Sequence, residues 1–154
     1  MIFVVRHASA GLRGSWDDDS QRPLDEKGMA QARALPGVIT EAMQGGAAVR
    51  LLASPYLRCR QTLQPLAETW DLDVMVDPRL AEESPIDGFR QLLDEATDAT
   101  VICSHGDMIP AVLKRLEYEG IEWLSAHDPR TAAVHVLERD GSLFTKVWCL
   151  APPR

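Results

Sequence analysis

The chain has 154 residues, of which 45% are hydrophobic and 25% are charged, and its formal net charge at pH 7 is −7. This length fits one domain with a sizeable core, which we expect to span residues 1–150, followed by a flexible tail at residues 151–154. The negative charge argues against nucleic acid as a partner, because a phosphate backbone selects a basic surface.

The cysteines and the hydropathy pattern indicate where the protein works. Cys59, Cys103 and Cys149 are odd in number and lack a CxxC spacing, so they predict neither a disulfide framework nor a zinc site. The apolar run at the N-terminus is too short for a signal peptide, and no other run reaches the roughly 18–20 apolar residues of a membrane span. We expect a cytoplasmic protein with reduced thiols and no membrane partner.

The first expected element is a strand. Met1–Val5 is apolar and rich in β-branched residues, which predicts a strand buried on both faces. Arg6 and His7 follow at its carboxyl end, where open α/β sheets place their ligand crevice. Ala8–Pro23 has the composition of a surface loop that walls this crevice. Its acidic run, Asp17–Asp19, is expected to be solvated rather than to bind a metal.

Two helices and a second strand are expected next. Asp25 is a plausible N-cap of a helix that Pro36-Gly37 should kink or break. Arg50–Ala53 predicts a short buried strand, after which Ser54 and Pro55 are expected as the N-cap and first turn of another helix. The apolar stripes of the two helices are Met29, Ala32, Leu35 and Ile39, and Tyr56, Cys59, Leu63, Leu66, Ala67 and Trp70.

The second half of the chain continues the alternation of strands and helices. The expected elements are a strand at Asp73–Val76, a short helix at Phe89–Glu95, a strand at Thr100–Cys103, a helix that begins near Asp107, and strands at Ala133–Leu137 and Leu143–Trp148. Arg139–Ser142 carries a hairpin signal, so the last pair is antiparallel. The fold class is therefore α/β, with three α/β/α layers around a mostly parallel six-stranded sheet that has one antiparallel strand.

Three of the strand ends carry side chains that suit phosphate chemistry. The first presents Arg6 and His7, the second leads to Arg58, and the fourth presents His105 before a helix that opens at Gly106. The carboxyl ends of parallel strands meet at one edge of the sheet, next to helix N-termini that favour anions. Two imidazoles and two guanidiniums are therefore expected to converge there.

At these positions the chain resembles the histidine phosphatase superfamily, also called phosphoglycerate mutase-like. Arg6-His7-Ala8 is similar to the family's N-terminal Arg-His-Gly motif, with Ala in place of Gly. Residues 54–62 resemble its Ser-Pro-x-x-Arg-x-x-x-Thr motif, Leu80-Ala81-Glu82 resembles Leu-x-Glu, and Ser104–Asp107 resembles the C-terminal His-Gly motif. The motifs occur in family order.

The resemblance implies a mechanism and a role for each residue. His7 is expected to attack phosphorus and form a phosphohistidine, while Arg6, Arg58 and His105 hold the phosphoryl oxygens. Glu82 is expected to protonate the leaving oxygen and then activate water. Gly106 and Arg13 complete the expected substrate-binding set. The alternative for Arg13 is that it is a solvated arginine of the loop. No metal or other cofactor is implied, because the cationic pocket takes its place.

Several assignments stay open at this point. Glu83 is the alternative to Glu82 as the acid, and Arg60 is expected to face solvent. His127 and His135 fit no motif, so the first is expected to be exposed and the second structural.

The small size and residues 22–28 resemble the SixA-type phosphohistidine phosphatases, and are also similar to the histidine phosphatase domain that follows a Nudix domain in some bacterial proteins. The expected activity is a phosphatase acting on a phosphohistidine, nucleotide, phosphoprotein or other phosphorylated small molecule. A phosphoglycerate mutase-type phosphotransferase, an inert phosphate-binding module and a metal-dependent hydrolase are the alternatives.

Overall fold

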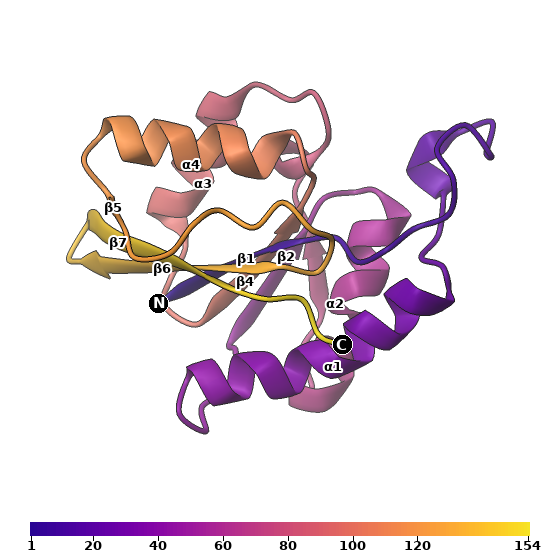
Figure 1. The fold of residues 1–154 in the computed structure, drawn as a ribbon, viewed down its shortest axis with the longest axis horizontal. Helices are drawn as coiled ribbons and strands as arrows, with labels where there is room; N and C mark the ends of the chain where they lie inside the picture. Colours follow the sequence, from indigo (N-terminus) through magenta and orange to yellow (C-terminus); the bar gives the residue numbers. More distant parts are fainter.

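The computed structural model describes residues 1–154 as a seven-stranded sheet with helices on both faces (Figure 1). The elements are β1 (Ile2–Arg6), η1 (Asp19–Gln21), α1 (Glu26–Ala42), β2 (Arg50–Ala53), α2 (Leu57–Trp70), β3 (Val74–Val76), η2 (Pro78–Leu80), α3 (Ile86–Glu95), β4 (Thr100–Ser104), α4 (Met108–Tyr118), β5 (Glu122–Trp123), β6 (Val134–Asp140) and β7 (Leu143–Leu150). Residues 151–154 form no helix or strand. None of the helices combines the length and the hydropathy needed to cross a membrane.

The strand order is β3-β2-β4-β1-β6-β7-β5. β1 to β4 pair in parallel, whereas β6 runs antiparallel to both β1 and β7, so the prediction of one antiparallel strand is confirmed. The sheet has seven strands rather than six because the two-residue β5 pairs with β7 at the edge. A strand this short leaves no periodic pattern in the sequence.

The core lies on both faces of the sheet. Within β1, Ile2 and Val4 join the apolar cluster under α3 and α4, while Phe3 and Val5 join the cluster under α1 and α2. All four side chains are fully buried, which confirms a strand covered on both sides. This burial follows from the parallel α/β arrangement, in which helices cover both faces.

The helices differ from expectation at three points. The sequence predicts a kink or a break at Pro36-Gly37, but α1 runs unbroken from Glu26 to Ala42 with Pro36 buried, so a break there is wrong. We attribute this to packing against α2, which outweighs one lost hydrogen bond. Met29 is 38% exposed and lies off the core stripe. α2 begins at Leu57 with Tyr56 as its N-cap, so Ser54 is not the N-cap. The Ser54 hydroxyl accepts from the Tyr56 N–H at 3.3 Å and lies 2.8 Å from Nε2 of His105.

The register of β1, β2 and β4 determines where these strands end relative to one another. Arg6 pairs with Ser104 across β1 and β4, and Ala53 pairs with Cys103 across β2 and β4. The next residues continue this pairing, because the His7 N–H donates to the Ser104 carbonyl at 3.0 Å. The residues that follow the three strands therefore lie along one edge, as the sequence predicts.

The first turn of α1 packs directly under the peptide that follows this edge. A Cβ built at Gly28 would lie 1.8 Å from the carbonyl oxygen of Ser9, two residues after His7. Neither the helix nor the Ser9 backbone has room for that atom, so only glycine fits here.

We expect Gly28→Ala to lower the free energy of unfolding by about 1–3 kcal/mol, because a methyl group forces two backbone segments apart. Gly37→Ala is the matched control in the same helix, since its Cβ would meet nothing within 4 Å. The control should gain up to about 1 kcal/mol from helix propensity. Urea unfolding measures both, and a gain in both variants would refute the packing argument.

Candidate active site

His7 directly follows β1, and one of its ring nitrogens is hydrogen-bonded to the backbone. Its Nδ1 lies 2.8 Å from the carbonyl oxygen of Ala8. A carbonyl oxygen only accepts, so Nδ1 carries the proton and the lone pair is on Nε2. Burial is the main cause that lowers the pKa of His7 to about 3, and the charges of His105, Arg58 and Arg6 act in the same direction. The imidazole is therefore neutral and available as a nucleophile at neutral pH.

Thr62 fixes the backbone next to His7. The Ala8 N–H donates to its Oγ1 at 2.9 Å, and the same hydroxyl donates to the Arg58 carbonyl at 2.7 Å. One buried hydroxyl thus joins the peptide after His7 to the helix turn that carries Arg58. This contact explains why threonine follows arginine by four residues in the second motif.

His105 is fully buried and its ring faces that of His7, with the centroids 5.5 Å apart and the planes at 64°. Its Nε2 lies 2.8 Å from the Ser54 hydroxyl, and its Nδ1 lies 3.4 Å from Oε1 of Glu82. A proton on Nδ1 suits both sides, because the Ser54 hydroxyl then donates to Nε2 while Nδ1 faces an acceptor. His105 is thereby oriented as a donor toward the site.

Arg58 is a fully buried cation held between two carboxylates. Its Nη2 lies 2.7 Å from Oε1 of Glu82 and 3.1 Å from Oδ2 of Asp19, and its Nη1 donates to the Asp19 carbonyl at 2.9 Å. The expectation that Asp19 is simply solvated is wrong. η1 turns its carboxylate inward, where Arg22 at 2.8 Å and Arg58 hold the pKa of Asp19 below its ordinary value.

Arg6 lies over the start of α4. Its Nη1 donates to the carbonyl of Pro129, and a Cβ at Gly106 would lie only 2.8 Å from its Cζ. Glycine at position 106 therefore leaves the space that the Arg6 guanidinium occupies. This steric need gives a physical reason for the glycine that follows His105.

Glu82 and Glu83 differ in what they contact. The Ser104 hydroxyl donates to the Leu80 carbonyl at 2.7 Å, which fixes the segment before Glu82 to the end of β4. The Glu82 carboxylate contacts Arg58, His105 and, at 3.2 Å, Arg13. Glu83 is exposed and only its backbone N–H is tied, to the Asp107 carboxylate.

These groups border a cavity of about 250 Å³, which we call the catalytic cavity. Its lining contains no hydrophobic residue and consists of Arg6, His7, Arg13, Glu82, Glu83, Gly106 and Asp107. Arg58 and His105 are fully buried beside this lining, and both contact the Glu82 carboxylate. A small polar anion is the ligand that such a donor set suits.

Two residues that the motifs do not specify, Arg60 and His127, lie differently from expectation. Arg60 is half-buried rather than solvated, and its Nε donates to the Pro55 carbonyl at 3.2 Å. His127 is half-buried rather than exposed, and its Nδ1 lies 3.0 Å from Nε2 of His135. The two rings stack beside the loop whose Pro129 carbonyl accepts from Arg6. Only tertiary structure brings these histidines together.

Comparison with known proteins identifies the family. The model of the histidine phosphatase superfamily (branch 1) matches residues 2–85, which is more than half of the chain. The chain belongs to the histidine phosphatase superfamily. A relative from Mycolicibacterium smegmatis (strain ATCC 700084 / mc(2)155), named 8-oxo-(d)GTP phosphatase, is 38% identical over 120 residues. That match covers 73% of this chain but only 36% of the relative, so the chain spans about a third of that protein's length.

Solved structures of histidine phosphatases share the fold. The protein histidine phosphatase SixA complexed with tungstate is 24% identical, with a TM-score of 0.72 over 98% of this chain and 96% of that one. A putative SixA from Agrobacterium tumefaciens is 20% identical, with a TM-score of 0.75 over 99% and 97% of the chains. Mycobacterial glucosyl-3-phosphoglycerate phosphatase is 16% identical, with a TM-score of 0.67 over 96% and 95%.

The buried neutral His7 predicts a pH-dependent stability. The unfolded chain takes up this proton near the ordinary pKa of 6.5, whereas the folded chain takes it up only near 3. Unfolding therefore binds a proton in this window, so the free energy of unfolding falls as pH falls from 6.5 to 3. We expect His7→Gln to remove up to about 1.4 kcal/mol per pH unit from this dependence. Denaturant titrations across the window measure it, and parallel curves for the two proteins would contradict the assignment.

Proposed function

We propose that this protein is a metal-independent phosphatase that hydrolyses a phosphomonoester or phosphohistidine through a covalent phosphohistidine on His7. The observation that carries the proposal is a neutral His7 whose Nε2 is free, next to Arg6, Arg58 and His105 at one edge of the sheet. This is a nucleophile beside fixed donors for the charge of a phosphoryl group.

The first step forms and breaks one bond each. The lone pair on Nε2 of His7 attacks phosphorus in line, and the bond from phosphorus to the leaving atom breaks. Arg6, Arg58 and His105 hold the phosphoryl oxygens, next to Gly106 and the N-terminus of α4, which begins at Met108. Glu82, in its protonated form, gives its proton to the leaving atom. Arg13, whose side chain is exposed and pairs with Glu82, contacts the leaving group in this proposal.

The second step restores the enzyme. The Glu82 carboxylate takes a proton from water, whose oxygen attacks phosphorus as the bond to Nε2 breaks. Inorganic phosphate leaves and His7 returns to its neutral form. Glu82 suits both steps because its carboxylate contacts Arg58 and His105, the same side chains that hold the phosphoryl group in this proposal. It therefore lies next to the reacting phosphorus. No step requires a metal ion.

The substrate class is a phosphorylated small molecule, nucleotide or phosphoprotein. The relatives carry names that refer to phosphohistidine, 8-oxo-(d)GTP and glucosyl-3-phosphoglycerate, so the family fold serves varied leaving groups. The rim of the catalytic cavity is open, with the Arg13 side chain 71% exposed. We also propose a cytoplasmic location, supported by three cysteines that are all free thiols.

Hydrolysis of an aryl phosphate tests the proposal. The wild type should turn over this substrate equally well with and without chelator, and His7→Ala should lose at least about 10³-fold in rate. Brief incubation with labelled substrate should give an acid-labile phosphoenzyme in the wild type only. Loss of the rate with chelator would favour a metal-dependent hydrolase. Absence of turnover would favour a phosphate-binding module, and transfer to an added alcohol without hydrolysis would favour a mutase.

Glu82→Gln and Glu83→Gln form a matched pair that tests the acid. We expect Glu82→Gln to lower kcat by about 10²–10⁴-fold on an alkyl phosphate, because an alkoxide leaving group needs the proton. The loss on a nitrophenyl phosphate should be smaller, because that leaving group departs without one. Glu83→Gln should stay within about twofold, and the reverse ranking would move the role to Glu83.

A further inference from the structure

A second recess adjoins the catalytic cavity and differs from it in having no carboxylate in its lining. It measures about 210 Å³ and shares Arg6, His7 and Arg13 with the catalytic cavity. The remaining lining residues are Ser9, Ala10, Arg22 and Thr131. We call this hollow the basic recess, because three arginines and no carboxylate line it. The carboxylates of Glu82, Glu83 and Asp107 all line the catalytic cavity instead.

Arg22 makes the basic recess a built feature rather than a patch of surface arginines. Its side chain is only 7% exposed. Its Nε lies 2.8 Å from Oδ1 of Asp19 and its Nη1 donates to the Gly11 carbonyl, whereas its Nη2 makes no hydrogen bond within the protein. Asp19 pairs with both Arg22 and Arg58, and Glu82 pairs with both Arg58 and Arg13. Two carboxylates therefore face three guanidiniums. A positive charge and an N–H pair are left for a ligand.

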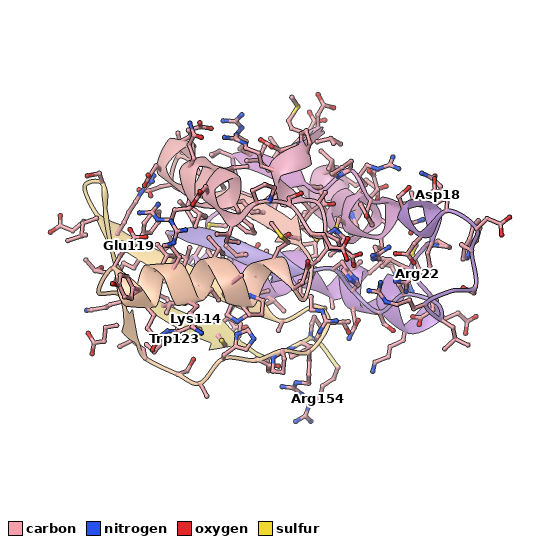
Figure 2. All side chains as sticks on the ribbon, turned by 90° about the horizontal axis from the view of Figure 1, so that it is seen from above. Asp18, Arg22, Lys114, Glu119, Trp123 and Arg154 are labelled. Atoms are coloured by element: carbon pink, nitrogen blue, oxygen red, sulfur yellow. The ribbon has the colours of Figure 1, made fainter.

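The positive surface continues past Thr131. A neighbouring hollow of about 270 Å³ shares this threonine and is lined by Lys27, Arg130 and Arg154 among others. Asp128 pairs with Arg130 at 2.7 Å, while Lys27 and Arg154 make no ion pair. Figure 2 shows Arg22 toward one end of the molecule, near Asp18, and Arg154 at the lower edge of the view, both away from Glu119. Cations therefore line two hollows that share Thr131, in a chain whose net charge is −7.

We propose that the basic recess binds a second phosphate group of the substrate, through Arg22 and Arg13 and next to Thr131. This inference rests on the proposed phosphatase function and narrows its substrate class. A substrate whose reacting phosphoryl lies at His7 extends either toward the carboxylates of the catalytic cavity or into the basic recess. The carboxylates of the catalytic cavity repel a second anion, whereas the arginines of the basic recess attract it. The preferred substrate is thus a diphosphate or a bisphosphate rather than a simple monoester.

Inhibition of aryl phosphate hydrolysis tests this inference with a matched set of anions. Methylphosphonate fills the reacting site alone, methylenediphosphonate adds a second anion one carbon away, and 1,3-propylenediphosphonate adds it at a longer spacing. We expect the better of the two diphosphonates to inhibit the wild type at least tenfold more strongly than methylphosphonate. A preference for the short spacing indicates a diphosphate chain, and a preference for the long one indicates two separate phosphates.

Two threonine-to-glutamate variants compare a negative charge inside the basic recess with the same charge elsewhere on the surface. Thr131→Glu puts a carboxylate into the basic recess, whereas Thr69→Glu puts one on the exposed surface of α2. We expect the tenfold advantage of the diphosphonate to fall to about onefold in Thr131→Glu and to persist in Thr69→Glu. Arg22→Gln, checked by circular dichroism for an intact fold, should reduce the advantage at least threefold without an added charge.

The outcomes separate this inference from the proposed function. Equal inhibition of the wild type by mono- and diphosphonates would overturn the second phosphate site, as would equal advantages in Thr131→Glu and Thr69→Glu. Failure of the wild type to hydrolyse any aryl phosphate, or full activity of His7→Ala, would instead overturn the phosphatase proposal.

Discussion

The parallel pairing of β1 with β4 is the constraint on which the site depends. Both strands end at the same level, because Arg6 pairs with Ser104 and the His7 N–H extends the ladder to the Ser104 carbonyl. The residues that follow, His7 and His105, therefore present their rings to each other although 98 positions separate them in the chain. A shift of the pairing by one residue would turn each side chain to the other face of the sheet.

Burial of charge gives this edge its chemical character. Arg58 is fully buried, and its cost of desolvation is offset by Asp19 and Glu82, one carboxylate from each side. The same burial keeps His7 uncharged, since its low pKa reflects first the loss of water and then the neighbouring cations. A neutral imidazole and permanently charged guanidiniums can therefore coexist at neutral pH, as the proposed mechanism requires.

Charge is divided unevenly around His7. The segment after η2 and the start of α4 contribute carboxylates to one side, while the loop between β1 and α1 contributes Arg13 and Arg22 to the other. Family membership and fold leave the substrate open, because relatives with the same architecture carry names that refer to different phosphorylated compounds. In this chain the two sides of the site next to His7 differ in charge, which is where the structure bears on the choice of substrate.

The sequence alone determined the strands, helix starts and turns that depend on neighbouring residues along the chain. The apolar run before Arg6 forms β1, Asp25 caps α1 through its contact with the Gly28 N–H, and Gly141 turns the hairpin at a positive φ of 61°. The motif spacings also determined which side chains meet at the sheet edge, because strands of a parallel sheet end at one side. Assignment to the family followed from the same residues.

Tertiary structure alone decided the contacts between segments without a shared pattern. Nothing local marks Asp19 as a partner of Arg58, and nothing in a Ser-Pro pair indicates that the Ser54 hydroxyl binds His105. α1 continues through Pro36 because its packing outweighs a local preference. Sequence periodicity reports burial and backbone propensity, whereas the partner of a buried polar group depends on which distant atoms the fold brings within hydrogen-bond reach.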